Sequence, residues 1–202
     1  MISYEVALGL GLLAAIVTAG SVDGQEIVLA QTHGFFTTLS NEMLGGPALG
    51  FFDWIVFKQP LAALICLVAI FAENNRLPFD LPEAEPELVG GYHTEYSGLK
   101  FAVYFLGEYC AMILMSGLFV TLFLGGWSLP GIVDPQGTGL INCLLSVAVF
   151  GTKLMAVLIF QVWIRWTLPR FRYDQLMNLG WKTLVPLTLV NLVVTAVVLT
   201  YV

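Results

Sequence analysis

The sequence predicts an all-α, polytopic membrane protein with about five transmembrane helices and an ordered, acidic cytoplasmic loop. Of its 202 residues, 58% are hydrophobic and only 11% are charged, and the mean hydropathy is +0.85. In a soluble domain, about a quarter of the residues are usually charged. A chain with so few charges could not cover a water-facing surface, which excludes a soluble monomeric enzyme.

The second observation behind this fold class is the length of the apolar segments. A helix that crosses a bilayer needs about 20 mainly apolar residues. The first such segment is no cleavable signal peptide, because Glu5 stands where a basic region should be. We expect one membrane domain, residues 1–202, with spans at about 2–19, 51–71, 101–123, 140–164 and 184–201.

The basic residues of the loops predict the orientation. The loops 20–50 and 125–139 contain neither Lys nor Arg, whereas all the loop bases lie in 72–100 and 165–183. Cytoplasmic loops of membrane proteins are enriched in Lys and Arg. We therefore expect loops 72–100 and 165–183 in the cytoplasm, with the amino terminus cytoplasmic and the carboxyl terminus external.

Charge and motifs exclude several kinds of partner and cofactor. The 14 acids and 8 bases give a net charge of −6, which disfavours nucleic acid, because phosphate binding needs clustered bases. Cys66, Cys110 and Cys143 are far apart in apolar stretches, and we expect them to be small buried hydrophobes. His33 and His93 have no second metal ligand at useful spacing. The sequence has no P-loop, GxGxxG, CxxC or HExxH motif, so we expect no metal, flavin or iron–sulfur cluster in this chain.

The second loop concentrates the acids. Residues 73–95 read ENNRLPFDLPEAEPELVGGYHTE, in which prolines interrupt any long helix and a glycine pair allows a sharp turn. One interpretation is a solvated acidic loop. The other is a proton-passing cluster, because carboxylates in a partly apolar setting raise one another's pKa through repulsion and desolvation. The six acids are Glu73, Asp80, Glu83, Glu85, Glu87 and Glu95.

Charges inside the predicted spans are the second candidate feature. Glu108 lies roughly 10 Å along its helix from Phe101 at 1.5 Å per residue, and Lys153 lies near the middle of the fourth span. A charge at the bilayer centre costs at least ~2.5–3.5 kcal/mol, so such residues normally face a partner or a hydrated path. Glu108 and Lys153 are a candidate pair. Lys58, near the external end of its helix, is expected to extend to the lipid headgroups.

The fourth loop, RWTLPRFRYDQLMNLGWK over 165–182, interleaves bases with aromatic residues. This pattern suits either interfacial anchoring at the cytoplasmic surface or a docking surface for an anionic partner. Pro60 and Pro186, near the starts of their helices, are expected to be structural.

At the second loop the chain resembles a known family. AENNRLPFDLPEAEPELVGGYHTEYSG (72–98) and KFAVYFLGEY (100–109) closely resemble the H subunit of bacterial NADH–quinone oxidoreductase, respiratory complex I, the counterpart of mitochondrial NADH dehydrogenase subunit 1. The resemblance extends through ISYEVALGL (2–10), LFLGGW (122–127) and the fourth-loop motif. Family members have further helices before the ISYE segment, so the chain resembles their carboxyl-terminal part, through truncation, a split gene or a misplaced start.

The resemblance implies a membrane-arm subunit of a proton-translocating NADH:quinone oxidoreductase, with quinone as the substrate of the complex. It implies a multi-pass protein of the bacterial inner membrane, with the peripheral-arm quinone-site subunits, neighbouring membrane-arm subunits, lipid and quinone as partners. No redox centre, FMN or iron–sulfur cluster is expected in the chain itself. The alternatives are a subunit of a related membrane-bound hydrogenase or a secondary transporter. Discontinuous helices and an internal repeat would favour a transporter, and the sequence shows neither.

The same resemblance assigns roles to residues by motif position. The loop acids would form a funnel near the quinone cavity, and the acids of the spans would continue it as a coupling path within the membrane. Basic and aromatic residues would balance these acids and form the interface with the peripheral arm. The expected path contains Glu5, Glu73, Asp80, Glu83, Glu85, Glu87, Glu95, Glu108 and, from its place in a span, Lys153. The expected interface contains Arg76, Phe79, Arg165, Arg170 and Arg172.

Overall fold

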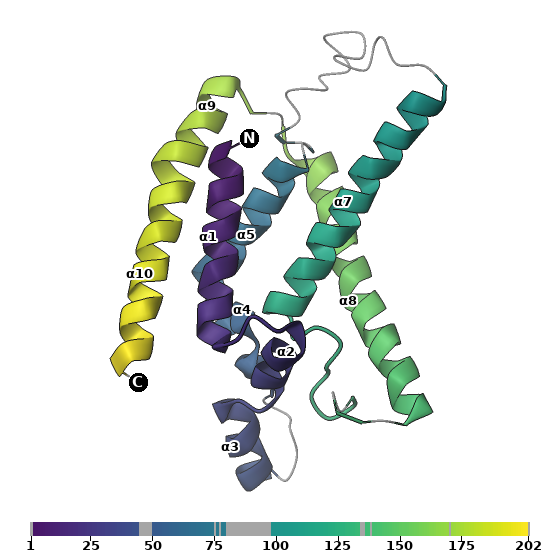
Figure 1. Ribbon diagram of the computed structural model, residues 1–202, viewed down its shortest axis with the longest axis vertical. Coiled ribbons are helices and arrows are strands. Elements are labelled where there is room, and N and C mark those ends of the chain that lie inside the picture. Colours follow the sequence, from purple (N-terminus) through teal and green to yellow (C-terminus); the bar gives the residue numbers. More distant parts are fainter. Residues whose placement is uncertain are drawn as a thin grey trace.

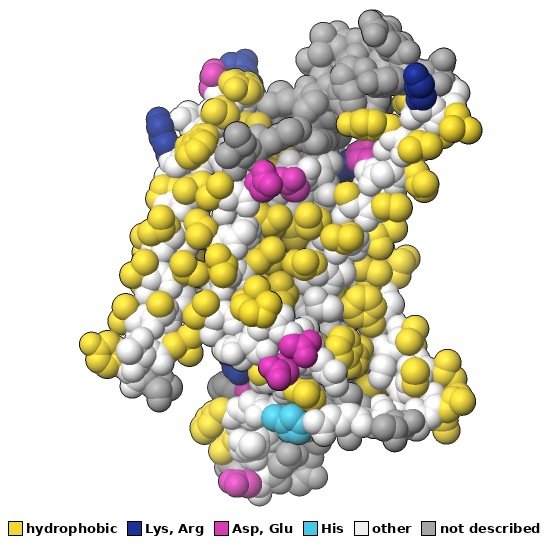
Figure 2. Space-filling model, viewed as in Figure 1, with side chains coloured by type: hydrophobic (Ala, Val, Ile, Leu, Met, Phe, Trp, Pro, Cys, Tyr) yellow, Lys and Arg dark blue, Asp and Glu magenta, His cyan; other side chains and the backbone are white. Residues whose placement is uncertain are grey.

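The computed structural model describes residues 2–44, 50–74, 76, 78–79, 98–133, 136–137, 139–169 and 171–201. These residues form helices, turns and one isolated β-bridge between Leu129 and Val133, which confirms the all-α prediction. The visible face carries a broad hydrophobic band across its middle, and its charged side chains gather towards the two ends (Figure 2). This distribution is typical of a membrane protein.

Six helices or helical segments build the bundle, and shorter ones connect them. The bundle consists of α1 (Ile2–Ala19), α5 (Pro60–Glu73), α7 (Leu99–Phe123), α8 (Leu140–Thr167), α9 (Tyr173–Asn178) and α10 (Val185–Tyr201). The short elements are α2 (Gly24–Thr32), α3 (Phe35–Leu44), η1 (Gly50–Asp53) and α4 (Ile55–Lys58), with a π-helical segment η3 (Leu179–Leu184) between α9 and α10.

Fewer of the described helices are long and apolar enough to cross a membrane than the five predicted. Among the described residues, three are long and apolar enough to span a membrane: Leu99–Phe123, Leu140–Thr167 and the continuous Tyr173–Tyr201. A fourth span requires a bent pair, Ser3–Ala19 with Gly24–Leu39, whose axes differ by 59°. The number of helices that could span a membrane in the described residues is therefore lower than the roughly five predicted.

The break lies in the second predicted span, 51–71. α4 ends at Lys58, and α5 begins at Pro60 and has only 14 residues, about 21 Å at 1.5 Å per residue, short of the roughly 30 Å bilayer core. Proline has no N–H to continue a helix but fits its first position. Pro60 is thus structural, as expected, and the second segment is a discontinuous helix that the sequence did not reveal.

Pro186 has a similar local consequence in the last long helix. The residues before it form the π-helical segment Leu179–Leu184, and the Val185 N–H donates a hydrogen bond to the Gly180 carbonyl. A proline ring within a helix crowds the carbonyl four residues earlier, and a widened turn relieves that contact. The helix therefore continues past Pro186 to Tyr201.

The helices pack in two groups. α1 lies between α5 and α10 and packs against both, while α7 packs mainly against α8 (Figure 1). Ser116 and Gln161 are two polar side chains that form hydrogen bonds inside the bundle, where an apolar solvent offers none. Ser116 donates to the Met112 carbonyl one turn earlier, and the Gln161 amide of α8 donates to the Ser116 hydroxyl of α7 over 3.0 Å.

The two ends of the molecule differ. The amino terminus, α9 and the start of α7 lie at one end, and the carboxyl terminus, α2, α3 and α4 lie towards the other (Figure 1). The described residues at the two edges of loop 72–100 and those of loop 165–183 therefore lie at one end. We call this the amino-terminal end, and the opposite one the carboxyl-terminal end.

Candidate functional site

The candidate site lies at the amino-terminal end, where the second and fourth loops meet α1 and α7. Several predicted site residues lie outside the described residues, so nothing is said of their placement. These are Asp80, Glu83, Glu85, Glu87, Glu95 and Arg170.

Arg76 and Glu108 form the central ion pair of the site. The Arg76 Nε lies 2.9 Å from the Glu108 Oε1, and each side chain is only 11% exposed. The guanidinium carbon also lies 4.7 Å from the ring centroid of Tyr109, the next residue on α7, in range of a cation–π interaction. The loop therefore supplies the charge that makes a carboxylate tolerable in an apolar helix.

The predicted pair of Glu108 with Lys153 is wrong. The Lys153 ammonium donates to three carbonyls at the end of α7, those of Leu124 (2.7 Å), Gly126 (3.1 Å) and Ser128 (2.6 Å). Leu124 is about 24 Å along the helix from Glu108 at 1.5 Å per residue. The sequence placed both charges within spans, but the middle of α8 lies level with the end of α7.

Lys153 binds where α7 leaves its carbonyls without helical partners. Such carbonyls carry a partial negative charge that favours a cation, and the Trp54 ring, 4.4 Å from the ammonium, covers it. Gly125 and Gly126 adopt positive φ angles of 72° and 54° and turn the chain there. A glycine pair after an apolar run is a helix-end signal, so the sequence could have shown where α7 ends, although not that Lys153 binds there.

Glu5 and Glu73 form an acidic pair at the same end as Arg76. Glu5 lies on α1 and is exposed, and Glu73 is the last residue of α5 and is half-buried. Their carboxylates are close enough for their charges to interact. The structure thus groups two predicted path residues on neighbouring helices, and Glu108 with its Arg76 partner stands beside the end of α5.

Phe79 joins the second loop to the fourth. Its ring lies between Tyr4 of α1 (5.8 Å between centroids) and Phe171 of the fourth loop (5.6 Å). Phe171 N–H donates to the Pro78 carbonyl over 3.1 Å, and the Tyr4 hydroxyl donates to the Leu176 carbonyl over 2.6 Å. The sequence singled out Phe79 but missed Tyr4 and Phe171, because no local pattern shows which loops meet.

Two other predicted interface residues face outwards. Arg165, in the last turn of α8, and Arg172, before α9, are both exposed. Neither forms an ion pair with another residue in the described parts of the chain.

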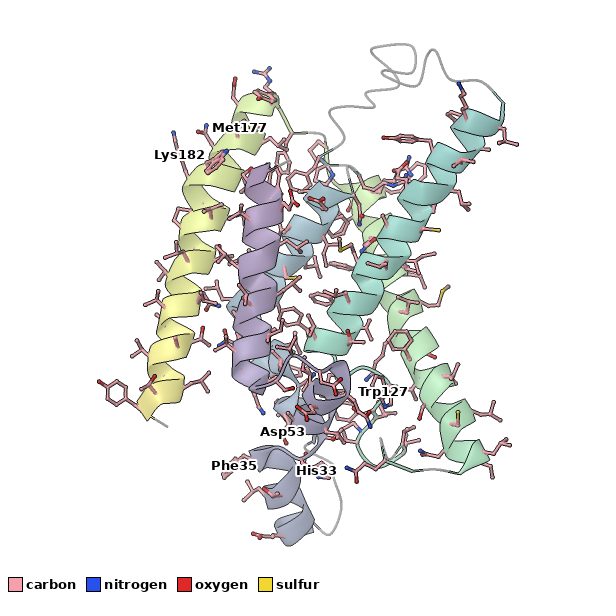
Figure 3. All side chains as sticks on the ribbon, in the orientation of Figure 1. His33, Phe35, Asp53, Trp127, Met177 and Lys182 are labelled. Atoms are coloured by element: carbon pink, nitrogen blue, oxygen red, sulfur yellow. The ribbon has the colours of Figure 1, made fainter. Side chains whose placement is uncertain are left out.

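The carboxyl-terminal end has a separate polar cluster around Asp53. This buried carboxylate accepts hydrogen bonds from the Thr37 backbone N–H (2.6 Å) and hydroxyl (2.7 Å). Lys58 Nζ lies 3.8 Å from its other oxygen. Asp53 and Trp127 lie at the opposite end of the molecule from Met177 and Lys182 (Figure 3).

The cysteines and histidines do not form a metal site in the described parts of the chain, where no group of three or more His, Cys, Asp or Glu side chains could hold an ion. Cys66 is buried, as predicted, but Cys110 and Cys143 are exposed. The prediction failed for these two because they lie on outward faces of α7 and α8, where apolar side chains are equally suited to lipid.

Comparison with known proteins places these features in a family. A family model described as NADH dehydrogenase matches residues 1–196. The H subunit of NADH-quinone oxidoreductase from Flavobacterium johnsoniae is 43% identical over 202 residues, covering 98% of this chain and 52% of that protein. An H subunit of the same enzyme from Koribacter versatilis is 45% identical over 200 residues, covering 97% and 51%.

Subunit 8 of the Rhodothermus marinus enzyme is 44% identical over 205 residues, covering 97% of this chain and 55% of the relative. The chain thus spans about half the length of the curated relatives it matches. The family model covers nearly all of the chain, and the resemblance noted in the second loop is confirmed. The chain belongs to the NADH dehydrogenase family, together with these H subunits and subunit 8 of NADH-quinone oxidoreductase.

Proposed function

We propose that this chain acts as a membrane-arm subunit of a proton-translocating NADH:quinone oxidoreductase. In this role its amino-terminal end helps form the quinone cavity at the junction with the peripheral arm. Its carboxylates couple quinone reduction to proton movement in the bacterial inner membrane. The names of the relatives favour this function over a hydrogenase subunit.

The observation that carries the proposal is the ion pair of Arg76 with Glu108, set where two loops converge. Removing one member of a buried ion pair leaves the other charge uncompensated, at a cost of about 3–5 kcal/mol. Arg76 lies at the beginning of the acidic loop in sequence, and we propose that a change of charge among the loop acids acts on the guanidinium that pairs with Glu108. This connection provides a physical route from the loop into the helix.

The aromatic contacts of Phe79 give this route a rigid support. Because Phe79 and Pro78 are fixed to Phe171, the start of the acidic loop cannot shift independently of the fourth loop. We propose that the exposed Arg165 and Arg172 contact the peripheral arm next to this joint. Reduction of quinone in the cavity would then alter the protonation of the loop carboxylates, and Glu73, Glu5 and Glu108 would pass the change into the membrane.

The test is the conservative substitution Glu108→Gln in the assembled complex, which removes the charge and keeps the shape. We expect NADH–quinone turnover and proton pumping to fall by roughly tenfold or more, equivalent to about 1.4 kcal/mol in the barrier. Oxidation of NADH by a water-soluble acceptor should survive, since that reaction does not use the cavity. Glu85→Ala in the loop should give the same split.

Glu26→Gln is the matched control, because Glu26 is an exposed acid on α2 at the opposite end. It should leave both activities unchanged. Full coupled pumping in both Glu108→Gln and Glu85→Ala would overturn the proposal.

A further inference from the structure

A second cavity lies at the carboxyl-terminal end, far from Arg76 and Glu108. Its volume is about 380 Å³, within the range of small-molecule sites. Its lining comes from the end of α1, the break before α5 and the last turns of α10, and the end of α10 lies near the carboxyl terminus (Figure 1). Its lining includes Thr18, Lys58, Gln59, Asn191, Val194 and Val198.

The lining has a polar part and an apolar part. Lys58 and the amides of Gln59 and Asn191 form the polar part, in which the Asn191 amide donates to the Gln59 oxygen over 3.2 Å. Val194 and Val198 form the apolar part and are 54% and 52% exposed. They belong to the outward face of α10, so the apolar wall continues directly into the surface that meets lipid.

Lys58 is the cation that this cavity presents. Its side chain is 37% exposed, whereas its neighbour Asp53 is fully buried. The distance of 3.8 Å between them is longer than a hydrogen bond, and the other Asp53 oxygen is already bonded to Thr37. The ammonium therefore keeps N–H donors for a second anionic oxygen that approaches from the cavity.

The position of the cavity indicates the class of ligand. The ends of spanning helices lie level with lipid headgroups, where aromatic residues such as the 88% exposed Tyr201 gather. A phospholipid carries its phosphate next to its acyl chains, and this cavity likewise holds Lys58 next to the valines of α10. Lysine is a common phosphate ligand, and apolar side chains gain by covering an acyl chain.

We propose that this cavity is a binding site for an anionic phospholipid, in which Lys58 holds the phosphate and α10 holds an acyl chain. The site is separate from the ion pair of Arg76 and Glu108. In this site Lys58 binds the lipid phosphate, beyond the anchoring at the membrane surface expected from the sequence. A free phosphate ion would bind only to the polar part of the cavity, and the apolar wall would add nothing to its affinity.

The experiment uses the delipidated full complex, titrated with phosphatidylglycerol or phosphatidylcholine and measured by native mass spectrometry. Lys58→Gln should weaken phosphatidylglycerol binding about tenfold, as expected for the loss of one charge-assisted hydrogen bond, and Lys58→Arg should retain it. Phosphatidylcholine binding should change little. Equal phosphatidylglycerol binding by Lys58→Gln and the unchanged chain would overturn the proposal.

A second pair of variants tests the apolar wall without touching the charge. Val194→Trp should fill the cavity and lose bound phosphatidylglycerol, whereas Val190→Trp, one turn away on the same face and outside the cavity, should not. Identical binding by these two variants would contradict the site. Inorganic phosphate alone should leave the thermal stability of the complex unchanged, and a stabilisation equal to that by phosphatidylglycerol would assign the site to a free anion instead.

Discussion

At the residue scale, the two charges inside the long apolar helices have different kinds of partner. Glu108 pairs with Arg76, and Lys153 donates to backbone carbonyls. The sequence correctly indicated that Glu108 and Lys153 need partners, since an isolated charge is costly in a bilayer. It could not identify those partners, because Arg76 lies in a loop and the Lys153 acceptors are backbone carbonyls. Carbonyls have no side-chain signature, and the relative depth of two antiparallel helices is set by loop length and packing.

The Lys153 cluster leads to a prediction of stability. Lys153→Met should lower the free energy of unfolding by about 2–4 kcal/mol, because three carbonyls at the end of α7 lose a charged donor. Unfolding of the purified chain in a denaturing detergent, followed by circular dichroism, measures this change. Lys182→Met, an exposed lysine of the π-helical segment, is the control and should cost less than about 0.5 kcal/mol. Equal stability of the two variants would rule out the capping role.

At the element scale, the sequence predicted where helices occur better than where they break. α1 has the predicted bounds, Ile2–Ala19, because an uninterrupted apolar run has no other way to satisfy its backbone in lipid. The segment 51–71 is predicted as one span because its composition is mainly apolar. The break at Gln59 and Pro60 depends on one residue without an N–H, and hydropathy averages do not detect it.

The turn after α7 allows a matched test of local backbone geometry. Gly126 has a φ of +54°, and an added Cβ would lie 2.6 Å from Val28 Cγ2, so Gly126→Ala should destabilise the chain by about 1–3 kcal/mol. Gly139, before α8, has a φ of −68° and open space around its Cα. Gly139→Ala should therefore be nearly neutral in the same detergent-unfolding measurement. A neutral Gly126→Ala would show that the turn is not held as described.

At the scale of the whole molecule, the distribution of charge unites the fold with the proposed function. The 14 acids and 8 bases behind the net charge of −6 include an acidic loop, Glu5 on α1, and two charges inside long helices, Glu108 and Lys153, that each have a partner. The family could be predicted because its longest motif is continuous in sequence. The contact between that motif and the fourth loop, through Phe79 and Phe171, could not be predicted, because these residues are far apart in the chain.

The orientation that the basic loops predict can be tested directly. Arg172 and Val22 are exposed and lie in loops at opposite ends of the bundle. In a background with Cys110 and Cys143 replaced by serine, Val22→Cys should react with a membrane-impermeant maleimide added to right-side-out vesicles, and Arg172→Cys should not. Inverted vesicles should reverse this pattern, because the loops with bases are predicted to be cytoplasmic. Labelling of Arg172→Cys from outside would show that the chain has the opposite orientation. The acidic loop would then lie across the membrane from a cytoplasmic peripheral arm. The buried Cys66 can remain in both variants, because it is enclosed by the packed core and should not react in folded protein.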